Sequence, residues 1–395
     1  MLYHLTVASL SLLARASLAT TIPTNALIPA LDKEFIDLSQ PSEELLSIHQ
    51  QLNREKFSPR SEFPLTVDVY LNIITSTNEG QDAVKNTTIT WMLDTLNNAY
   101  KPGQITFQLQ DTARIINSTW AANEDDENMR SILHKGDKST LNIYLVEALI
   151  DWIGGGNRDT IIIGSTTSPD ELRFKNRLSQ DGVLLNIGTL PGGSFPDKTT
   201  TCIHEVGHWF GLLHTFQGGC AGGDGVDDTP AQASPSYDCN KPRNTCPNDP
   251  GMDPIKNFMD YGSDDCRSEF TPGQMKRIKE LWNKFRDPAV TLVLEEDFLY
   301  QIRRIFNRIR YLPSLQLAFT DDATLKWQLL TQLLAAQKDL TDNIGKPDFG
   351  TRVKQHFAGF RAIRNVEFSM DKDETLKLEL PLQFKEAEEG LLKMA

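Results

Sequence analysis

The sequence lacks any apolar run that is long enough to cross a membrane as a helix. The apolar stretch near its start, Leu5 to Ala14, is far shorter than the roughly 20 residues that a membrane span needs. Positive charge is scarce as well: 40 Lys and Arg stand against 53 Asp and Glu, which gives a net charge of −13. Phosphate groups of nucleic acids and anionic lipids repel such a chain, so neither nucleic acid nor membrane is an expected partner.

Histidine is sparse and unevenly distributed. Three of the seven histidines lie within the eleven residues HEVGHWFGLLH, which begin at His204. On a helix, His204 and His208 leave the same face, so both imidazoles can bind one metal ion. Gly211 tolerates the positive φ that ends such a helix, and His214 can then return as a third ligand. A buried amphipathic helix with three chance histidines explains this clustering poorly.

The same stretch carries the groups of a hydrolytic site. Three neutral imidazoles around zinc leave the fourth position open for water, which is the arrangement of catalytic zinc sites. Glu205 lies one step round the helix and can act as the general base toward a metal-activated water. The sequence therefore predicts a zinc metalloendopeptidase that hydrolyses peptide bonds in proteins.

Two alternatives to this interpretation stay open. One is an aminopeptidase of the wider HExxH class, which usually takes its third ligand from a glutamate on a later helix; His214 argues against it. The other is a secreted zinc-binding module that is catalytically inactive and whose C-terminal region mediates interactions. The presence of Glu205 argues against this second alternative.

The first 60 residues are typical of a secreted, extracellular protein. Residues 1–19 are predicted to be a signal peptide, because the apolar run is followed by small residues suited to cleavage. Residues 20–60 form an N-terminal segment and a candidate pro-region, in which Pro41-Ser42-Glu43-Glu44 opens a helix. Secretion makes the sequons at Asn86 and Asn117 candidate glycosylation sites.

Residues 61–286 are predicted to form the catalytic domain, with an upper subdomain to about residue 211 and a lower subdomain at 212–286. Apolar alternation predicts five strands, at 65–75, 105–109, 141–145, 160–164 and 183–187, and helical spacing predicts helices at 88–100 and near 129–134. This order predicts an α/β (α+β) fold in which helices back a twisted, mixed five-stranded sheet. Regular patterning stops from about 218 to 254, before a helix that begins at Thr271.

Four of the five cysteines lie in this loop-rich lower part, at positions 220, 239, 246 and 266. In a secreted chain we expect them to form two disulfides that hold the long loop. Four cysteines allow three pairings, and the spacing does not choose among them. Cys202 lies roughly 200° round the helix from His204, so its expected role is that of a small buried packing residue.

A second group of residues, Asn-Phe-Met-Asp-Tyr at 257–261, follows the histidine motif in the sequence. If it belongs to the metal site, Met259 forms an apolar floor under the ion. Tyr261 then reaches the edge of the site and donates its hydroxyl to the developing oxyanion. On spacing alone, ordinary core positions explain both side chains better than a metal site does.

Together, HEVGHWFGLLH and NFMDY resemble the metzincin metallopeptidases, and more narrowly their pappalysin (cytophagalysin-like) family. The resemblance is greatest to the secreted fungal extracellular metalloproteases of that family and covers roughly Pro41 to Phe285. Further matching stretches are PSEELL at 41–46, HTFQGGC at 214–220, DDTP at 227–230 and FTPGQ at 270–274. The chain departs from its relatives in lacking their cysteine pair in the region 152–183, and it has no cysteine before Cys202 that could cap the metal.

The resemblance implies a role for each residue of the two motifs. The implied roles are zinc ligands for His204, His208 and His214, general base for Glu205, Met-turn for Met259, and a residue that swings onto the transition state for Tyr261. It also implies the disulfides Cys220–Cys246 and Cys239–Cys266. Segment 224–229 is similar to a calcium-binding loop of relatives, with the ligating positions at Asp224, Val226 and Thr229. We therefore expect Zn²⁺ and also Ca²⁺ as cofactors, proteins and peptides as substrates, and a monomer.

The resemblance ends at Asp287. Residues 287–395 contain two predicted amphipathic helices, at 298–312 and 321–343, and an alternating stretch at 376–380 that predicts a strand. Arginines on the outer face of the first helix are more typical of a solvated surface than of RNA or membrane contact. We expect an extra, mostly helical region, which is either an accessory domain or the product of a fused reading frame.

Overall fold

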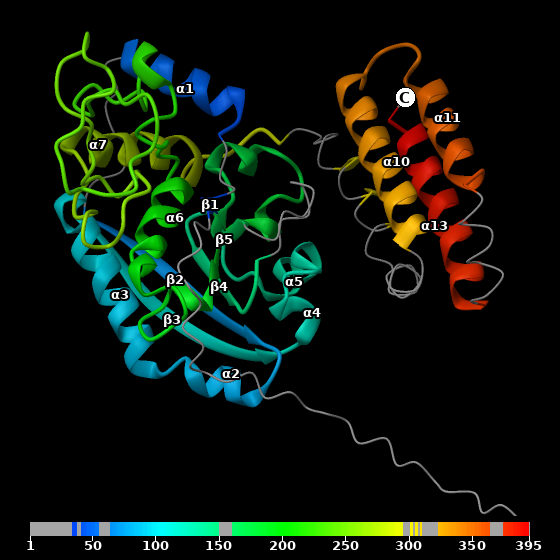
Figure 1. Cartoon of the computed structure of the whole chain (residues 1–395), viewed down its shortest axis with the longest axis horizontal. Coiled ribbons are helices and arrows are strands. Elements are labelled where there is room, and N and C mark those ends of the chain that lie inside the picture. Colours follow the sequence, from blue (N-terminus) through cyan, green and yellow to red (C-terminus); the bar gives the residue numbers. More distant parts are fainter. Residues whose placement is uncertain are drawn as a thin grey trace, which may run out of the picture.

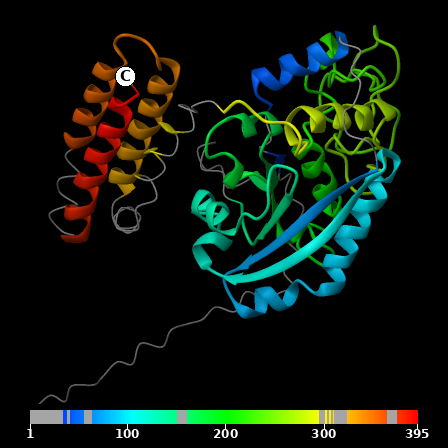
Figure 2. The same cartoon turned by 180° about the vertical axis from the view of Figure 1, so that it is seen from behind.

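The computed structural model describes residues 34–37, 41–54, 64–149, 160–294, 301–302, 305–306, 309, 323–363 and 374–394. Figures 1 and 2 show an α/β body formed by the residues up to 294 and a separate bundle of helices formed by the C-terminal residues. In the described part of the chain, no helix combines the length and the apolar character that a membrane span requires. The predicted signal peptide, residues 1–19, lies outside the described residues.

A mixed six-stranded sheet forms the centre of the α/β body, in the order β1-β5-β6-β4-β2-β3. Strands β6, β4, β2 and β3 pair in parallel, β5 pairs antiparallel with β6, and β1 pairs in parallel with β5. The strands are β1 (Glu34–Asp37), β2 (Leu65–Thr75), β3 (Ile105–Ile116), β4 (Leu141–Val146), β5 (Thr160–Thr166) and β6 (Val183–Asn186).

The predicted mixed sheet with backing helices is confirmed, and it contains one strand more than the five predicted. The five predicted strands are confirmed as β2 to β6, and β1 adds a sixth in the segment that we predicted to be an irregular N-terminal region. Four residues are too few to show the alternation that identifies a strand, and the pairing partner of β1 lies more than 120 residues away at β5. Residues 34–37 form a strand because they pair with β5 at the edge of the sheet, and not because of a local sequence pattern.

Both faces of the sheet are covered, and β4 shows how the sequence achieves this. Leu141, Ile143 and Leu145 point to a core shared with the helices α3 and α6, whereas Tyr144 and Val146 point to a second core shared with α4 and α5. These helices are α3 (Asn86–Tyr100), α4 (Ser118–Ala121), α5 (Asp126–Leu133) and α6 (Thr201–Trp209); α2 (Asn78–Ala83) follows β2. The helices predicted at 88–100 and near 129–134 are thereby confirmed. The sheet supports α6, the helix that carries the histidine motif.

Two further helices, α1 (Glu43–Arg54) and α7 (Pro272–Leu281), pack together beside the end of α6, as Figure 1 shows. The Ser42 hydroxyl accepts a hydrogen bond from the Leu45 N–H at 2.9 Å, which confirms the predicted cap of α1. Thr271 and Gln274 form a capping box at the start of α7. The two helices share a small core with the residues after α6, made of Leu45, Ile48, Leu52, Leu213, Leu281 and Phe285.

The C-terminal bundle has a core of its own. Its helices include α10 (Ala323–Asp342), α11 (Phe349–Arg361) and α13 (Glu374–Leu392), and described residues between 301 and 309 are also helical. The core consists of apolar residues between Ile302 and Leu391. The helix predicted at 321–343 is confirmed, and the strand predicted at 376–380 is wrong, because these residues lie in α13. The arginines at 303, 304, 308 and 310 lie outside the described residues.

Candidate metal centre

Helix α6 carries the histidine motif, and the half-buried carboxylate of Asp264 fixes its start. Asp264 accepts hydrogen bonds from the backbone N–H groups of Thr199, at 2.6 Å, and Thr200, at 2.9 Å, and from both hydroxyls. Burial raises the pKa of Asp264, but these hydrogen bonds outweigh it and hold the pKa below its usual value. A carboxylate at this end of a helix also interacts favourably with the helix dipole.

Gly211 ends the helix as the sequence predicts. It adopts φ +96°, and the N–H groups of Gly211 and Leu212 donate to the carbonyls of His208 and Gly207 at 2.8 and 2.9 Å. A Cβ at Gly211 would also lie 2.7 Å from Cδ1 of Leu281. The turn reverses the chain and brings His214 back toward α6.

The structure brings the three predicted ligands together. The Nε2 atom of His208 lies 3.1 Å from that of His204 and 3.0 Å from that of His214. All three imidazoles are buried. Nitrogen ligands at 2.0–2.1 Å from a tetrahedral zinc ion would lie about 3.3 Å apart, so the three nitrogens have nearly the spacing that the ion requires.

The outer nitrogen of each ring fixes its tautomer. Nδ1 of His204 lies 2.6 Å from the Phe258 carbonyl, Nδ1 of His208 lies 2.7 Å from the Leu212 carbonyl, and Nδ1 of His214 lies 3.4 Å from Oε1 of Gln217. These oxygens only accept hydrogen bonds, so each Nδ1 carries the proton and each Nε2 presents a lone pair. Three converging lone pairs repel one another unless a cation lies between them. The donor set therefore fits a metal ion, with its outer shell already in place.

Glu205 lies on α6 next to His204, is fully buried, and touches the sheet at Gly164 in β5. A Cβ at Gly164 would lie 2.6 Å from Cδ of Glu205 and 2.7 Å from Cγ. Only a glycine leaves room for the carboxylate between the helix and β5. No local sequence pattern identifies Gly164 as a site residue, because its importance depends on a residue 41 positions away in the sequence.

The second motif lies directly below and beside the histidines. Met259 is fully buried, and a Cβ at Gly207 in α6 would collide with its sulfur. The Tyr261 ring lies 5.0 Å from the His214 ring and 5.9 Å from the His204 ring. Phe216, which the sequence analysis did not single out, stacks on His214 with ring centroids 4.9 Å apart. Met259 thus lies against α6, and the Tyr261 ring lies beside two of the candidate ligands.

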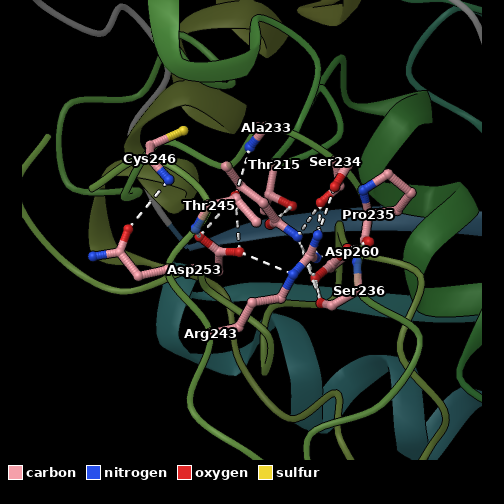
Figure 3. A network of polar contacts seen from close by, with 12 residues as sticks. Thr215, Ala233, Ser234, Pro235, Ser236, Arg243, Thr245, Cys246, Asp253 and Asp260 are labelled. Atoms are coloured by element: carbon pink, nitrogen blue, oxygen red, sulfur yellow. Dashed lines mark hydrogen bonds and ion pairs between the residues drawn. The ribbon is translucent and has the colours of Figure 1, made fainter. Parts of the chain in front are cut away.

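Asp260 anchors this motif to the lower loops, and the sequence analysis missed it too. Its Oδ1 accepts from the N–H groups of Ser236 and Tyr261 at 3.0 and 2.9 Å, and its Oδ2 accepts from Nε2 of Gln232 at 3.1 Å. The Thr215 hydroxyl donates to Oε1 of Gln232 at 2.9 Å, which connects the network to the residue after His214. Figure 3 shows Asp260, Ser236 and Thr215 converging between the loops.

A neighbouring part of the same network holds the outer loop. Arg243 donates to the carbonyls of Ser234 and Pro235 at 2.9 and 2.8 Å and pairs with Asp253 at 3.3 Å. Asp253 also accepts from the Thr245 N–H at 2.8 Å (Figure 3). Polar contacts thus replace regular secondary structure in a segment that is rich in Gly, Pro and Asp.

Two disulfides, Cys220–Cys246 and Cys239–Cys266, close the lower loops. The pairing implied by the resemblance is therefore confirmed. Cys202 is a buried free cysteine in the main core, as expected, and burial raises the pKa of its thiol.

The candidate calcium loop is a compact, buried turn. Asp224, Val226 and Thr229 are all buried. The Asp224 carboxylate accepts from the Val226 N–H at 3.0 Å and from Nε2 of Gln274 at 3.2 Å. Burial raises the pKa of Asp224 to about 7. A cation beside this carboxylate would offset the cost of burying its charge.

Comparison with known proteins finds metalloproteases among the chains that are similar to this one. Residues 185–283 match the family model Peptidase_M43, described as "Pregnancy-associated plasma protein-A". The chain is 39% identical over 269 residues to an extracellular metalloprotease of Pyricularia oryzae, a match that covers 65% of this chain and 92% of the relative. It is 43% identical over 229 residues to an extracellular metalloprotease of Neurospora crassa, covering 57% and 77%. A solved structure of mirolysin in complex with compound 9 is similar at 23% identity and a TM-score of 0.44, covering 55% of this chain and 92% of that one.

The fold and the site define a metallopeptidase whose active helix rests on a mixed sheet and whose third histidine follows a glycine turn. The chain belongs to the pappalysin family of metzincin metallopeptidases. An inactive zinc-binding module is not favoured, because the similar proteins are named as metalloproteases.

Proposed function

We propose that this protein is a secreted zinc endopeptidase in which His204, His208 and His214 hold the metal ion. The observation that carries the proposal is the convergence of three Nε2 lone pairs, 3.0 and 3.1 Å apart, from rings whose Nδ1 atoms are all bound to acceptors. When bound, zinc lowers the pKa of a water molecule and polarises the scissile carbonyl of the substrate.

The protein's own groups supply the proton transfers and the oxyanion contact. Glu205 accepts the proton of the attacking water and later passes it to the leaving amine. Its burial between α6 and Gly164 fixes the carboxylate beside the metal site. Tyr261, packed at the edge of the His204 and His214 rings, donates its hydroxyl to the oxyanion. Met259 supports the histidines from below.

Casein hydrolysis with and without a zinc chelator tests this function. We expect the purified protein to cleave casein, to lose nearly all activity with the chelator, and to recover it when zinc is added back. Absent hydrolysis, or hydrolysis that ignores the chelator, would contradict the proposal. A soluble chelator that has been presaturated with zinc is the matched control.

We also propose that a calcium ion binds at Asp224, Val226 and Thr229. A carboxylate, a backbone carbonyl and a hydroxyl are oxygen donors of the kind that calcium prefers. The burial of all three residues supports a structural ion that ties this turn to α7 through Gln274. Calcium would then raise the melting temperature in a concentration-dependent way, and Asp224→Asn would abolish that rise. An unchanged melting temperature with millimolar calcium would refute this site.

The proposed location is extracellular, like that in the names of the related metalloproteases. Asn86 is exposed at the start of α3, and Asn117 caps α4 through its side-chain oxygen at 3.1 Å from the Trp120 N–H. Both leave the amide nitrogen available for a glycan. A loss of mass after treatment of the secreted protein with an N-glycosidase would support glycosylation, and an unchanged mass would exclude it.

For the domains, we propose a signal peptide at 1–19, an N-terminal segment that includes a pro-region, a catalytic domain that includes 61–286, and an accessory bundle within 287–395. The bundle's separate core supports the last division. Peptide mapping of the secreted protein would reveal both mature ends. Loss of the bundle from all mature molecules would argue against an accessory role. We expect the protein to act on proteins and peptides as a monomer, which sedimentation can test.

A further inference from the structure

One residue outside the predicted catalytic domain reaches the metal-binding turn. His49 lies on α1, is only 1% exposed, and places its Nε2 atom 2.9 Å from the carbonyl oxygen of Gly211. Gly211 is the positive-φ residue between His208 and His214. The contact joins segments that are 162 residues apart, so no sequence pattern announces it.

The partners of His49 determine where its proton lies. The guanidinium of Arg277, on α7, contacts Nδ1 of His49, and a guanidinium only donates hydrogen bonds. Nδ1 must therefore accept, so Nε2 carries the proton and donates it to the Gly211 carbonyl. Burial, together with Arg277, lowers the pKa of His49 to about 3, which agrees with a neutral imidazole. Arg277 is itself fixed by Glu280, 2.9 Å from its Nε, and by Asn53.

The carbonyl that His49 holds belongs to the turn that orients the ligands. The next carbonyl in the chain, that of Leu212, accepts the Nδ1 proton of His208 at 2.7 Å. His214 follows two residues later. If the Gly211 peptide rotates, the Leu212 carbonyl moves with it, and both His208 and His214 lose their positions. A buried carbonyl without a donor would also favour such a rotation, because it is costly to leave unpaired.

Apolar packing supports the same contact. Leu45, Ile48 and Leu52 of α1 pack against Leu213, which lies within the turn, and against Leu281 of α7. The Ser42 hydroxyl, which caps α1, also donates to Asp170 at 2.6 Å. The helix is thus attached to the catalytic body at its start and along its buried face.

We propose that His49 is a positioning residue of the metal centre, and that α1 is a permanent part of the catalytic unit instead of a removable pro-region. The hydrogen bond from His49 to Gly211 holds the turn in the form that presents His208 and His214 to the metal. The proposal rests on the proposed function in so far as it assumes that these histidines bind zinc. It predicts that maturation cuts the chain before Glu43.

The test measures zinc affinity by competition with a chelator, in a Glu205→Gln background that prevents self-cleavage. His49→Phe keeps the ring volume and removes both hydrogen bonds, so we expect zinc to bind about 10–100-fold more weakly, as for other outer-shell residues. His49→Gln can still donate to Gly211 and accept from Arg277, and we expect it to restore most of the affinity. Met129→Ala, in the second core shared with α4 and α5, is the control for a general loss of stability: it should lower the melting temperature and leave the zinc affinity unchanged.

Two results would overturn the proposal: zinc binding by His49→Phe that equals that of the parent, which is the protein with Glu205→Gln alone, or a loss in Met129→Ala as large as that in His49→Phe. A parent protein that binds no zinc would overturn it together with the metal site. If the parent binds zinc but the wild-type protein does not hydrolyse casein, only the proposed function fails, and the comparison of His49 variants still decides the proposal.

Discussion

The position of the Glu205 carboxylate requires a residue without a side chain at position 164. Alanine at this position would place a Cβ 2.6 Å from Cδ of Glu205, so the carboxylate must move. We expect Gly164→Ala to retain its zinc and to lose about 100-fold or more in kcat/KM, since small displacements of catalytic groups have effects of this size. Steady-state kinetics and metal analysis check both parts.

Gly222→Ala is the matched control, because a Cβ there meets nothing within 4 Å. It should keep wild-type kinetics. Equal activity of Gly164→Ala and Gly222→Ala would show that Glu205 does not need its place beside β5.

The residues that the sequence identifies are those whose chemistry depends on short spacing. His204, Glu205 and His208 share one helical face or its flank, and Gly211 has a backbone conformation that few other residues adopt. The positions that it misses act through distant partners. Asp260 binds Ser236 and Gln232, and His49 binds Gly211, so their roles appear only when the chain is folded.

At the scale of elements, strand β1 occupies the outer edge of β5 beside the active site. Its residue Asp37 pairs with Gly164, the glycine that contacts Glu205. An extended peptide substrate is expected to add its backbone to a sheet edge, so it would compete with β1 for this one. The position of β1 agrees with a pro-region that lowers activity until it is removed.

A chain that begins at Pro41 should therefore cleave peptides faster than a chain that begins at Thr20. A few backbone hydrogen bonds worth about 1 kcal/mol each correspond to a gain of roughly tenfold or more in kcat/KM. Both chains keep α1, so the comparison isolates the segment before it. Equal kcat/KM for the two chains would show that β1 does not block the substrate.

Length decides which elements the sequence predicts. The eleven residues of β2 show a clear alternation, and the long helices α3 and α10 show a clear helical period. Five alternating residues at 376–380 fit a strand and also one side of a helix, and packing within the bundle selects the helix α13. The four residues of β1 carry too little pattern for any prediction.

At the scale of the whole molecule, a buried ion pair joins the sheet, the active helix and the end of the α/β body. The Arg286 guanidinium binds Asp181 with N–O distances of 2.8 and 3.0 Å, donates to the Trp209 carbonyl at 3.0 Å, and lies 3.6 Å above the Trp209 ring. Trp209 also donates its Nε1 proton to Asp181 at 3.1 Å. Three segments that are far apart in the sequence thus meet at one carboxylate.

This pair makes stability depend on acid pH. Burial raises the pKa of Asp181. Arg286 and the hydrogen bonds from Thr167 and Trp209 lower this pKa by more than burial raises it, so the net shift is downward. A group with a lowered folded pKa stabilises above its unfolded value, near 3.9, and that stability is lost as the pH falls through the folded pKa. Asp181→Asn should therefore reduce the steepness with which the unfolding free energy falls below pH 4.

The same variant leaves the Arg286 charge buried without its partner, which should cost about 3–5 kcal/mol at neutral pH. Urea denaturation at several pH values measures both effects. Thr112→Ser, a change at a half-buried hydroxyl outside this network, serves as the control. An acid slope identical to that of the wild type would show that Asp181 is not a source of the pH dependence.

The general architecture can be predicted from the sequence. The two faces of the sheet and one side of α6 are buried, and the apolar residues that bury them recur at regular spacing in the sequence. The arrangement of the lower loops does not follow from it, since disulfides, the Asp260 network and the Asp181–Arg286 pair hold segments that have no periodic pattern. The described residues of the C-terminal bundle have a core of their own.

The central claim is that two groups act together in peptide-bond hydrolysis. One is a metal ion that three histidines bind, and the other is the buried carboxylate of Glu205, which acts as the base. Glu205→Gln tests it most directly, because the substitution preserves the size of the side chain and removes its capacity to accept the proton. We predict one zinc ion per chain in both proteins, and casein hydrolysis that is lost almost entirely in the variant. A Glu205→Gln protein that binds zinc and still hydrolyses casein at the wild-type rate would contradict the claim.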